Sequence, residues 1–286
     1  MTYSIVAHDP DENAWGVAVA SKFLAAGAVV SWARGGVGAV ATQALARVSY
    51  GRQGLKLMEQ GKTAQETIDL LIQADEGRDH RQVGLVDPHG NAAAYTGKDC
   101  HDWAGHLVGD GFTCQGNILT GGDTLEAMAQ AFTSAKGELA DRLVEALLAG
   151  DTIGGDRRGK QSAAVMVVIP NGGYGGDNDN YLDLRVDDHS DPVNRLKELV
   201  GIHHLFFGQQ NPDDLMPITS DIAREIQALL AGQYYEGAID GQWGEQSVQA
   251  FWAMVGNENL EERWNLDGDI NRIDSVVLDY VRSRFG

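Results

Sequence analysis

The sequence is poor in cysteine, proline and basic residues. Its two cysteines, Cys100 and Cys114, allow at most one internal disulfide, which is too few for a secreted scaffold framed by disulfides. With 6 prolines and 43% hydrophobic residues, the composition also excludes a disordered or collagen-like chain. Because 22 Lys and Arg face 41 Asp and Glu, the net charge of -19 would repel a nucleic-acid backbone or an anionic membrane surface. We therefore expect a globular protein that binds neither nucleic acid nor membrane.

Long apolar runs are also missing. The longest one, residues 163–169, is far shorter than the ~20 residues that a membrane-spanning helix needs. No positively charged segment followed by an apolar one opens the chain, so no export signal is recognisable. These features predict a soluble, cytoplasmic protein with reduced thiols.

The predicted elements come in groups: strands, two helices, strands, two helices, strands and one helix. Thr63 and Glu66 form a capping-box signature for one helix, and residues 138–149 and 191–207 have apolar faces of helical period. Grouped strands favour an antiparallel, layered α+β domain over a doubly wound parallel sheet. The expected strands are 2–7, 15–20, 28–31, 37–42, 82–86, 92–96, 111–115, 162–169 and 181–186.

A second, smaller domain is predicted at the C-terminal end. Residues 209–217 hold two prolines and several polar residues, which is typical of a linker. From Asp213 onward the chain is more acidic, with 14 acids against 5 bases. We predict a first domain over 1–208, this linker, and a small helical domain over 218–286.

Several long segments of the first domain indicate its family. They read MTYSIVAHD, WGVAVASKFLAAGAVVSWARGGVGAVATQA, QVGLVD, WAGH, QGNIL and GGDRRGKQSAA. Together with the order of elements, these segments resemble domain-of-unknown-function family 1028 over residues 1–208. The resemblance implies the N-terminal-nucleophile hydrolase fold associated with that family, a four-layer α-β-β-α sandwich. The family has no established activity.

The tail segment IQALLAGQYYEGAIDGQWGEQSVQAFWAMVG carries Gln-Leu-Leu, Gly-x-Ile-Asp-Gly and Trp-Gly patterns. It is similar to small three-helix peptidoglycan-binding modules. The resemblance implies peptidoglycan fragments as a partner, with Asp240 in the binding motif and with Tyr234 and Trp243 stacking on sugar rings. Alternatively these aromatic rings form the core of a small helical unit, and Asp240 shapes a turn.

Thr2 is the nucleophile that the first resemblance implies. In N-terminal-nucleophile hydrolases the side chain of the first mature residue attacks, while its own α-amine, with a pKa near ~8, accepts the proton. The small side chain of Thr2 permits removal of Met1, and Thr2 begins the first predicted strand. The alternative is a β-branched residue that merely suits a strand.

Four further residues are predicted to join Thr2 because their strands end beside it. Ser21 would hydrogen-bond the α-amine, and Lys22 would lower the pKa of that amine by like charge. Thr42 and Gln43 end the fourth strand, whose backbone N–H groups would stabilise an oxyanion. Alternatively, Ser21 and Lys22 are merely exposed residues at the end of a strand. Thr42 and Gln43 would then belong to a strand of small residues that packs closely in the sheet.

Gln115, Asn117, Asp156 and Arg158 are the candidate substrate-binding residues. The amides of Gln115 and Asn117, in a Gln-Gly-Asn sequence, are suited to orient a substrate amide. Arg158 lies in the most basic segment of an acidic protein and suits a substrate carboxylate. Alternatively, the two amides satisfy loop backbone groups, and Asp156 forms a structural pair with an arginine.

We expect neither a metal nor a cofactor. Cys100, His101, His106 and Cys114 have metal-capable atoms, but their spacing does not match a zinc finger or ribbon. The leading hypothesis is a hydrolase of an amide bond in a small-molecule or peptide-like substrate. The alternative is a non-catalytic binding protein on the same scaffold, and a homo-oligomer is open in both cases.

Overall fold

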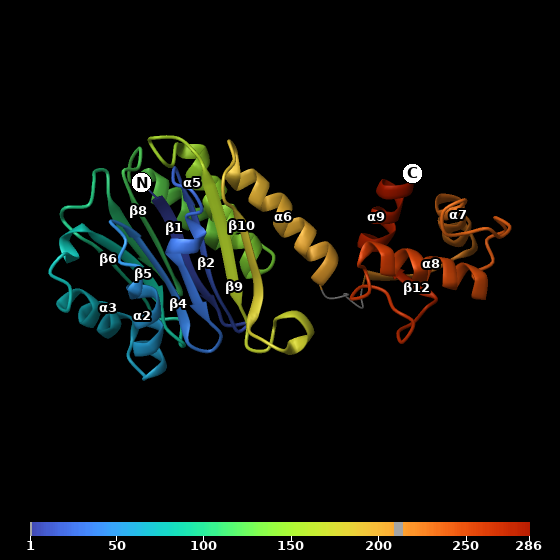
Figure 1. The fold of residues 1–286 in the computed structure, drawn as a ribbon, viewed down its shortest axis with the longest axis horizontal. Helices are drawn as coiled ribbons and strands as arrows, with labels where there is room; N and C mark the ends of the chain where they lie inside the picture. The colour runs from blue at the N-terminus through green and yellow to red at the C-terminus, as the bar shows by residue number, and fades with distance from the viewer. Residues whose placement is uncertain (1, 209–213) are drawn as a thin grey trace. The chain divides into compact units, whose positions relative to one another are not determined.

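The computed structural model describes residues 2–208 and 214–286, which fall into two compact units (Figure 1). The first unit is Met1–Val200 and the second is Gly201–Gly286. Met1 and residues 209–213, which hold part of the predicted linker 209–217, lie outside the described residues. None of the helices in the described part of the chain is long and apolar enough to cross a membrane.

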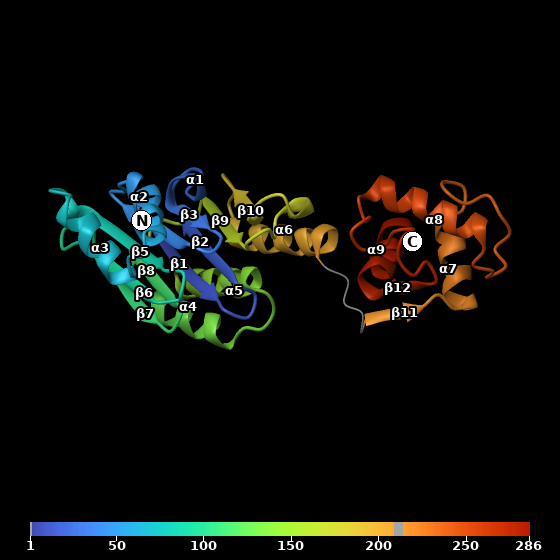
Figure 2. The same ribbon diagram turned by 90° about the horizontal axis from the view of Figure 1, so that it is seen from below.

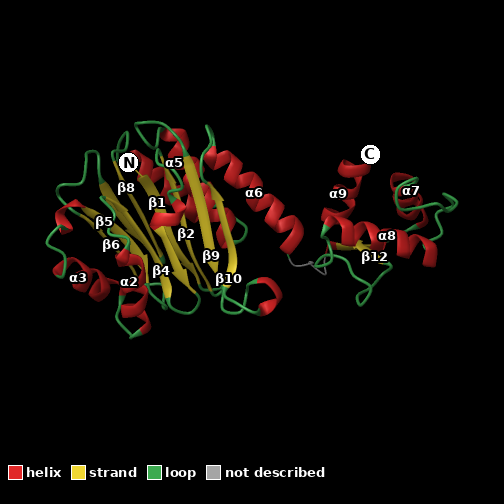
Figure 3. Ribbon diagram, in the orientation of Figure 1, coloured by secondary structure: helices red, strands yellow, loops and turns green. Residues whose placement is uncertain are grey.

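Two antiparallel sheets form the first unit (Figure 3), which confirms the predicted antiparallel α+β class. The larger sheet has the strand order β10-β9-β2-β1-β8-β7, and the smaller has the order β3-β4-β5-β6. The strands of the larger sheet are β1 (Thr2–Asp9), β2 (Ala14–Ser21), β7 (Gly105–Gly109), β8 (Phe112–Asn117), β9 (Ser162–Val168) and β10 (Asn180–Val186). Those of the smaller sheet are β3 (Ser31–Arg34), β4 (Gly38–Ala44), β5 (Arg81–Val86) and β6 (Ala92–Thr96).

Helices cover the outer face of each sheet (Figure 2). The helices α4 (Asp123–Ser134) and α5 (Leu139–Ile153) pack on the six-stranded sheet. On the four-stranded sheet lie α2 (Ser49–Glu59) and α3 (Ala64–Gln73), and α3 begins with the predicted capping box. The inner faces of the two sheets contact each other through buried apolar side chains, including Val17, Val19, Ala39, Ala41 and Ala164.

The alternation of side chains along β1 decides which residues reach the layer between the sheets. Tyr3 and Ile5 join the apolar core that α4 and α5 form with the six-stranded sheet. Thr2, Ser4 and Val6 therefore point the other way, toward the four-stranded sheet, and Val6 belongs to the apolar cluster there. The first two of these side chains place hydroxyl groups between the sheets.

The predicted strand at residues 28–31 is wrong. Gly27–Val30 forms the short helix α1, and strand β3 begins only at Ser31. A Cβ on Gly27 would lie 2.3 Å from the Cβ of Ala164, so this helical turn packs directly on β9. That long-range packing outweighs the local β propensity of two valines.

The second unit is helical, with one short pair of strands. Its core includes Ile226, Phe251, Trp264, Ile273 and Val281, all buried. Its elements are β11 (Leu215–Pro217), α7 (Ser220–Leu230), α8 (Glu245–Glu258), β12 (Arg272–Asp274) and α9 (Ser275–Phe285), preceded by the last turns of α6 (Pro192–Phe207).

Candidate functional site

Thr2 and Ser21 lie side by side at one end of the six-stranded sheet. They are opposite each other in the register of β1 and β2, and their hydroxyl oxygens are 3.0 Å apart. Both residues are buried, with Thr2 8% and Ser21 2% exposed. On its other side Thr2 faces Asn117 of β8 in register. A second hydroxyl thus fixes the Thr2 hydroxyl at the strand end, where an adjacent base could activate it.

Gln43 reaches from the smaller sheet to the backbone of Thr2. Its Nε2 donates to the carbonyl oxygen of Thr2 at 3.3 Å, and its Oε1 accepts from the Ser4 hydroxyl at 2.7 Å. The neighbouring Thr42 places its side chain on the opposite face of β4, where its hydroxyl donates to the carbonyl of Arg47 at 3.3 Å. The structure therefore brings the Gln43 side chain to Thr2 but not that of Thr42.

Gln43 belongs to a buried network of amides between the sheets. Its Nε2 also donates to Oε1 of Gln82 at 2.9 Å, and Nδ2 of Asn117 donates to the same oxygen at 2.9 Å. Gln82 in turn donates to the carbonyl of Gly116 at 2.7 Å. The network links the ends of β4, β5 and β8 around Thr2. Sequence patterns gave no signal for Gln82 as part of this site.

Gln115 is wholly enclosed in the same network. Its Nε2 donates to the Ser4 hydroxyl at 2.7 Å, its Oε1 accepts from Thr113 at 2.7 Å, and the residue is 0% exposed. Room for this amide comes from Gly84, where a Cβ would lie 2.0 Å from Oε1 of Gln115. The structure thus places Gln115 behind the site rather than in contact with a substrate, which corrects the predicted substrate-binding role.

Asp156 ties the segment before β9 to the end of β2. Its carboxylate accepts from the backbone N–H of Lys22 at 2.7 Å and from that of Arg158 at 2.9 Å. The Arg158 guanidinium lies 3.3 Å from the same carboxylate, which is the structural ion pair of the alternative interpretation. The ammonium group of Lys22 donates to the carbonyl of Lys160 at 3.3 Å, so this segment, rather than Thr2, holds it.

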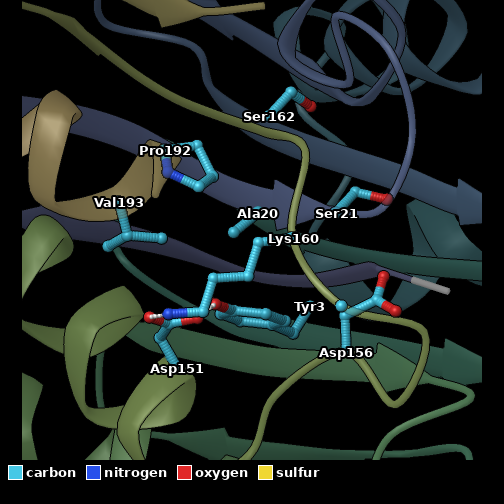
Figure 4. A pocket seen from close by; sticks show the side chains of 10 residues that line it. Tyr3, Ala20, Ser21, Asp151, Asp156, Lys160, Ser162, Pro192 and Val193 are labelled. Atoms are coloured by element: carbon cyan, nitrogen blue, oxygen red, sulfur yellow. Dashed lines mark hydrogen bonds and ion pairs between the residues drawn. The ribbon is translucent and has the colours of Figure 1, made fainter. Parts of the chain in front are cut away.

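A small pocket of about 180 Å³ lies at these strand ends, lined by Tyr3, Asp151 and Lys160 among others (Figure 4). Nζ of Lys160 lies 2.5 Å from the Asp151 carboxylate, and the Tyr3 hydroxyl donates to that carboxylate at 3.4 Å. The hydrogen bond to Asp151 raises the pKa of Lys160, and burial, followed by the charge of Asp151, raises the pKa of Tyr3. Both groups stay protonated at neutral pH, so this pocket holds a structural ion pair.

A larger pocket opens beside Asn117. Its empty space is about 470 Å³, counting the part open to solvent. Asn117 lines this pocket and is the cross-strand partner of Thr2, so the pocket reaches the strand next to the candidate nucleophile. The other lining residues come from segments far apart in the sequence, and no sequence pattern indicated that they share a pocket. They are Ala44, Leu45, His80, Asp99, Cys100, His101 and Ile118.

A buried carboxylate fixes one wall of this pocket. Asp75, which is 5% exposed, accepts from Arg47 at 2.8 Å, from Arg81 at 2.9 Å and from the Tyr50 hydroxyl at 2.9 Å. Burial by itself raises the pKa of Asp75, but the hydrogen bonds, that from Arg81 first, outweigh it and hold the pKa well below its usual range. Arg81 also donates to the carbonyl of Leu45 at 2.7 Å, which connects this cluster to the pocket wall.

The two candidate sugar-stacking residues of the second unit take part in packing. The Trp243 ring lies edge-on to Phe251 with centroids 5.6 Å apart, and its Nε1 donates to the carbonyl of Ile270 at 2.8 Å. Tyr234 lies edge-on to Phe285 at 5.9 Å. Both rings are half-buried, so each presents only part of its surface to a ligand.

Asp240 lies exposed in a loop that Gln227 holds in place. Its carboxylate accepts from the backbone N–H of Gln242 at 2.8 Å, as expected for a turn. Gln227 is 1% exposed, accepts from the backbone N–H of Gly241 at 2.9 Å and donates to the Ser247 hydroxyl at 3.0 Å. The motif thus builds a fixed loop with Asp240 at its surface.

The described residues include no group of three His, Cys, Asp or Glu side chains that could hold a metal ion. Cys100 and Cys114 are both thiols without a disulfide, and burial raises the pKa of each. Neither thiol is therefore activated as a nucleophile.

Both units match known protein families. The model of DUF1028, described as a family of unknown function, matches residues 2–196. The model described as "Putative peptidoglycan binding domain" matches residues 206–281. None of the curated proteins matches the chain.

Solved structures also resemble the chain. The crystal structure of protein SPO2555 from Silicibacter pomeroyi, a DUF1028 protein, is 30% identical with a TM-score of 0.65, covering 73% of this chain and 94% of that one. Anbu (ancestral beta-subunit) from Yersinia bercovieri is 12% identical with a TM-score of 0.32, covering 70% and 96% of the two chains, and this likeness carries no argument. Both resemblances found in the sequence are confirmed: residues 206–281 match the peptidoglycan-binding model, and the chain belongs to the DUF1028 family.

Proposed function

We propose that the chain is an N-terminal-nucleophile hydrolase that cleaves an amide bond through Thr2. Its first unit would then be the four-layer α-β-β-α sandwich of that class. The observation that carries the proposal is the pair of hydroxyls at the ends of β1 and β2, with Thr2 Oγ1 and Ser21 Oγ 3.0 Å apart. Two facing sheets with helices on their outer faces and the pocket beside Asn117 support it.

Thr2 acts once Met1 has been removed, because its own α-amine then serves as the base. The amine takes the hydroxyl proton, Oγ1 attacks the carbonyl carbon of the substrate, and a tetrahedral oxyanion forms. The C–N bond then breaks, and the ammonium gives its proton to the leaving nitrogen, which departs as an amine and leaves an ester on Thr2. Water hydrolyses the ester with help from the same base, releasing a carboxylic acid and restoring the hydroxyl. The cycle consumes one water.

The neighbours of Thr2 have distinct roles in this proposal. Ser21 holds the hydroxyl and then the amine in place, and Gln43 fixes the carbonyl of Thr2 from the other sheet. Asn117, whose Nδ2 donates to Gln82, would offer its amide oxygen to the substrate at the border of the pocket. The carbonyl of Lys160 holds the Lys22 ammonium and Asp156 pairs with the Arg158 guanidinium, so we assign neither cation a direct role in the reaction.

A peptide epoxyketone tests the nucleophile before any substrate is known. The reagent forms a two-bond adduct with an N-terminal threonine, because the hydroxyl oxygen adds to the ketone and the α-amine opens the epoxide. We expect an intact mass equal to the chain without Met1 plus one reagent. Thr2→Ala should abolish the adduct, whereas Thr133→Ala, which removes an exposed hydroxyl on α4, should keep it. A chain with a free Thr2 that forms no adduct would sink the proposal.

For the second unit we propose the binding of peptidoglycan fragments, with Asp240 in the contact surface and the exposed edges of Tyr234 and Trp243 beside it. The family match and the fixed loop around Asp240 support this assignment. Titration of the full chain with soluble muropeptides in a calorimeter should give binding heat. Asp240→Ala should weaken it, and Asp221→Ala, which removes an exposed acid of α7, should not. The absence of heat at about millimolar ligand would remove the glycan assignment.

A further inference from the structure

The pocket beside Asn117 has a carboxylate without a permanent cation. The Asp99 side chain is 47% exposed, and the one ion-pair contact it makes among the described residues is with Nε2 of His80 at 3.8 Å. His80 is a cation only when it is protonated. The adjacent Lys98 forms its ion pair with Asp79, 3.2 Å away. Asp79 is the main cause of the raised pKa of Lys98, and the charge of Asp99 adds to it without an ion-pair contact. The polar wall of the pocket therefore offers a negative charge to a ligand.

The same pocket also has apolar lining residues, which are Ala44, Leu45 and Ile118. Leu45 is 65% exposed, and covering such a leucine with a ligand is favourable. Apolar side chains in the same pocket as a single carboxylate are complementary to a molecule that carries an ammonium group next to an apolar side chain.

The walls of the pocket are also fixed in position. The backbone N–H of Leu45 donates to the carbonyl of His80 at 3.2 Å, and that of Asp99 donates to the carbonyl of Asp79 at 2.8 Å. Across the pocket, the N–H of Ile118 donates to the carbonyl of His101 at 2.9 Å. Main-chain hydrogen bonds thus join the lining segments, so a ligand would meet a preformed site.

We infer that this pocket binds the amino-terminal end of a small amide, with the ammonium group on Asp99 and an apolar side chain on Leu45 and Ile118. The inference rests on the proposed function for the reaction and specifies its substrate class: an aminoacyl amide or short peptide with an apolar first residue. The pocket's empty space of about 470 Å³, part of it open to solvent, leaves room for a small compound of this kind. Asn117 pairs with Thr2 in the strand register and also lines the pocket, so we place the first carbonyl of the ligand toward the nucleophile.

Two probes test this inference, one with a free ammonium group and one in which that amine is acetylated. L-leucinamide and N-acetyl-L-leucinamide are titrated by NMR into the full chain that carries Thr2→Ala, so that no turnover consumes the ligand. We expect L-leucinamide to bind at least about tenfold more tightly, since a partly exposed charge pair contributes on this scale. Asp99→Asn should bring the dissociation constants of the two probes to within about twofold of each other. Asp110→Asn, which removes an exposed acid in the turn at the other end of β8, should leave the ratio unchanged.

A second variant tests the apolar wall. Leu45→Ala should reduce the preference for leucinamide over glycinamide, while the preference for the free amine over its acetylated form stays. Equal or tighter binding of the acetylated probe, an unchanged ratio in Asp99→Asn, or no binding of either probe at about 50 mM would overturn the inference. Leucinamide that binds but is never cleaved by the parent chain would refute the hydrolase proposal alone. Cleavage of acetylated amides without preference for the free amine would refute the ammonium site alone.

Discussion

The layer between the two sheets has two regions of opposite chemistry. Where β2 and β9 face β3 and β4, the side chains are valines and alanines, such as Val17, Val19, Ala39 and Ala164. Where β8 and the start of β1 face β5 and the end of β4, the side chains are hydroxyls and amides, and they form one hydrogen-bonded network. The residues of this polar region are Ser4, Gln43, Gln82, Thr113, Gln115 and Asn117.

The two regions contribute differently to the protein. Apolar contacts stabilise the sheets without fixing any one side-chain orientation, because the hydrophobic effect is non-directional. Buried amides stabilise little on balance, but an unpaired amide is costly, so the network permits few arrangements. The polar region lies at the end of the sheets where Thr2 and the larger pocket are found. One region therefore holds the fold together, whereas the other surrounds the candidate nucleophile.

Removal of the nucleophile should affect turnover strongly and stability very little. Thr2→Ala should reduce the turnover of any amide that the parent cleaves by at least about 10³-fold, because the attacking oxygen is lost. Its melting temperature should stay close to that of the parent, since one hydroxyl contact with Ser21 contributes only about 1 kcal/mol. Thr2→Ser should keep partial activity. Turnover by Thr2→Ala comparable with that of the parent would assign the chemistry to another residue.

Filling the space at Gly84 should damage the polar region by steric overlap. The new Cβ would lie 2.0 Å from Oε1 of Gln115 and 2.4 Å from Oγ1 of Thr113. We expect Gly84→Ala to lower the free energy of unfolding by roughly 3 to 5 kcal/mol, from overpacking and broken hydrogen bonds together. Gly201→Ala in helix α6, where a Cβ meets nothing within 4 Å, should raise it by up to about 1 kcal/mol. Equal effects of both changes in urea unfolding would argue against a tightly packed network.

Replacing an amide by a hydrocarbon of similar size tests the network without overpacking. Gln43→Leu would remove the donor to the Thr2 carbonyl and to Gln82, leaving buried polar atoms unpaired. The expected loss in unfolding free energy is about 2 to 3 kcal/mol, together with lower turnover because Thr2 is less well fixed. Thr42→Val, which removes one hydroxyl contact on the other face of the same strand, should cost about 1 kcal/mol and leave turnover nearly unchanged. A Gln43→Leu variant as stable as Thr42→Val would show that the network does not depend on the hydrogen bonds of Gln43.

Acid should weaken the support of the pocket wall through Asp75. Because its pKa is lower in the folded state than in the unfolded state, the stability it contributes is present above pH ~4, the unfolded value. That stability is lost as the pH falls below about 4 toward the lower folded pKa. Urea unfolding at several pH values should therefore show a smaller acid dependence in Asp75→Asn than in the parent. Asp110→Asn should keep the pH dependence of unfolding seen in the parent. The same pH dependence in Asp75→Asn as in the parent would contradict the stabilising role of Asp75.

Strand alternation and hairpin geometry make part of the site predictable. Thr2 and Ser21 belong to consecutive strands joined by a short turn, so their proximity follows from local pairing. The same reasoning places Gln43 at the end of its strand. It could not show that Gln115 is enclosed, because a strand pattern gives the face of a side chain but not its partners on another sheet.

Other features depend on contacts that no local pattern encodes. The pocket walls formed by Leu45, His80 and Asp99 come from loops distant in sequence, and Asp75 is connected to them through two arginines. Helix α1 forms because it packs on β9, against the local strand propensity. Tertiary packing therefore determines the pocket walls and helix α1, which sequence periodicity could not predict.

The proposed mechanism requires Thr2 to be the first residue of the mature chain. An intact-mass measurement on protein purified from its native host shows directly whether it is. We expect a mass lower than that of the full sequence by one methionine residue, with a terminal amine on Thr2. A chain that keeps Met1 in full would have no base beside the hydroxyl, and this result would contradict the proposed mechanism.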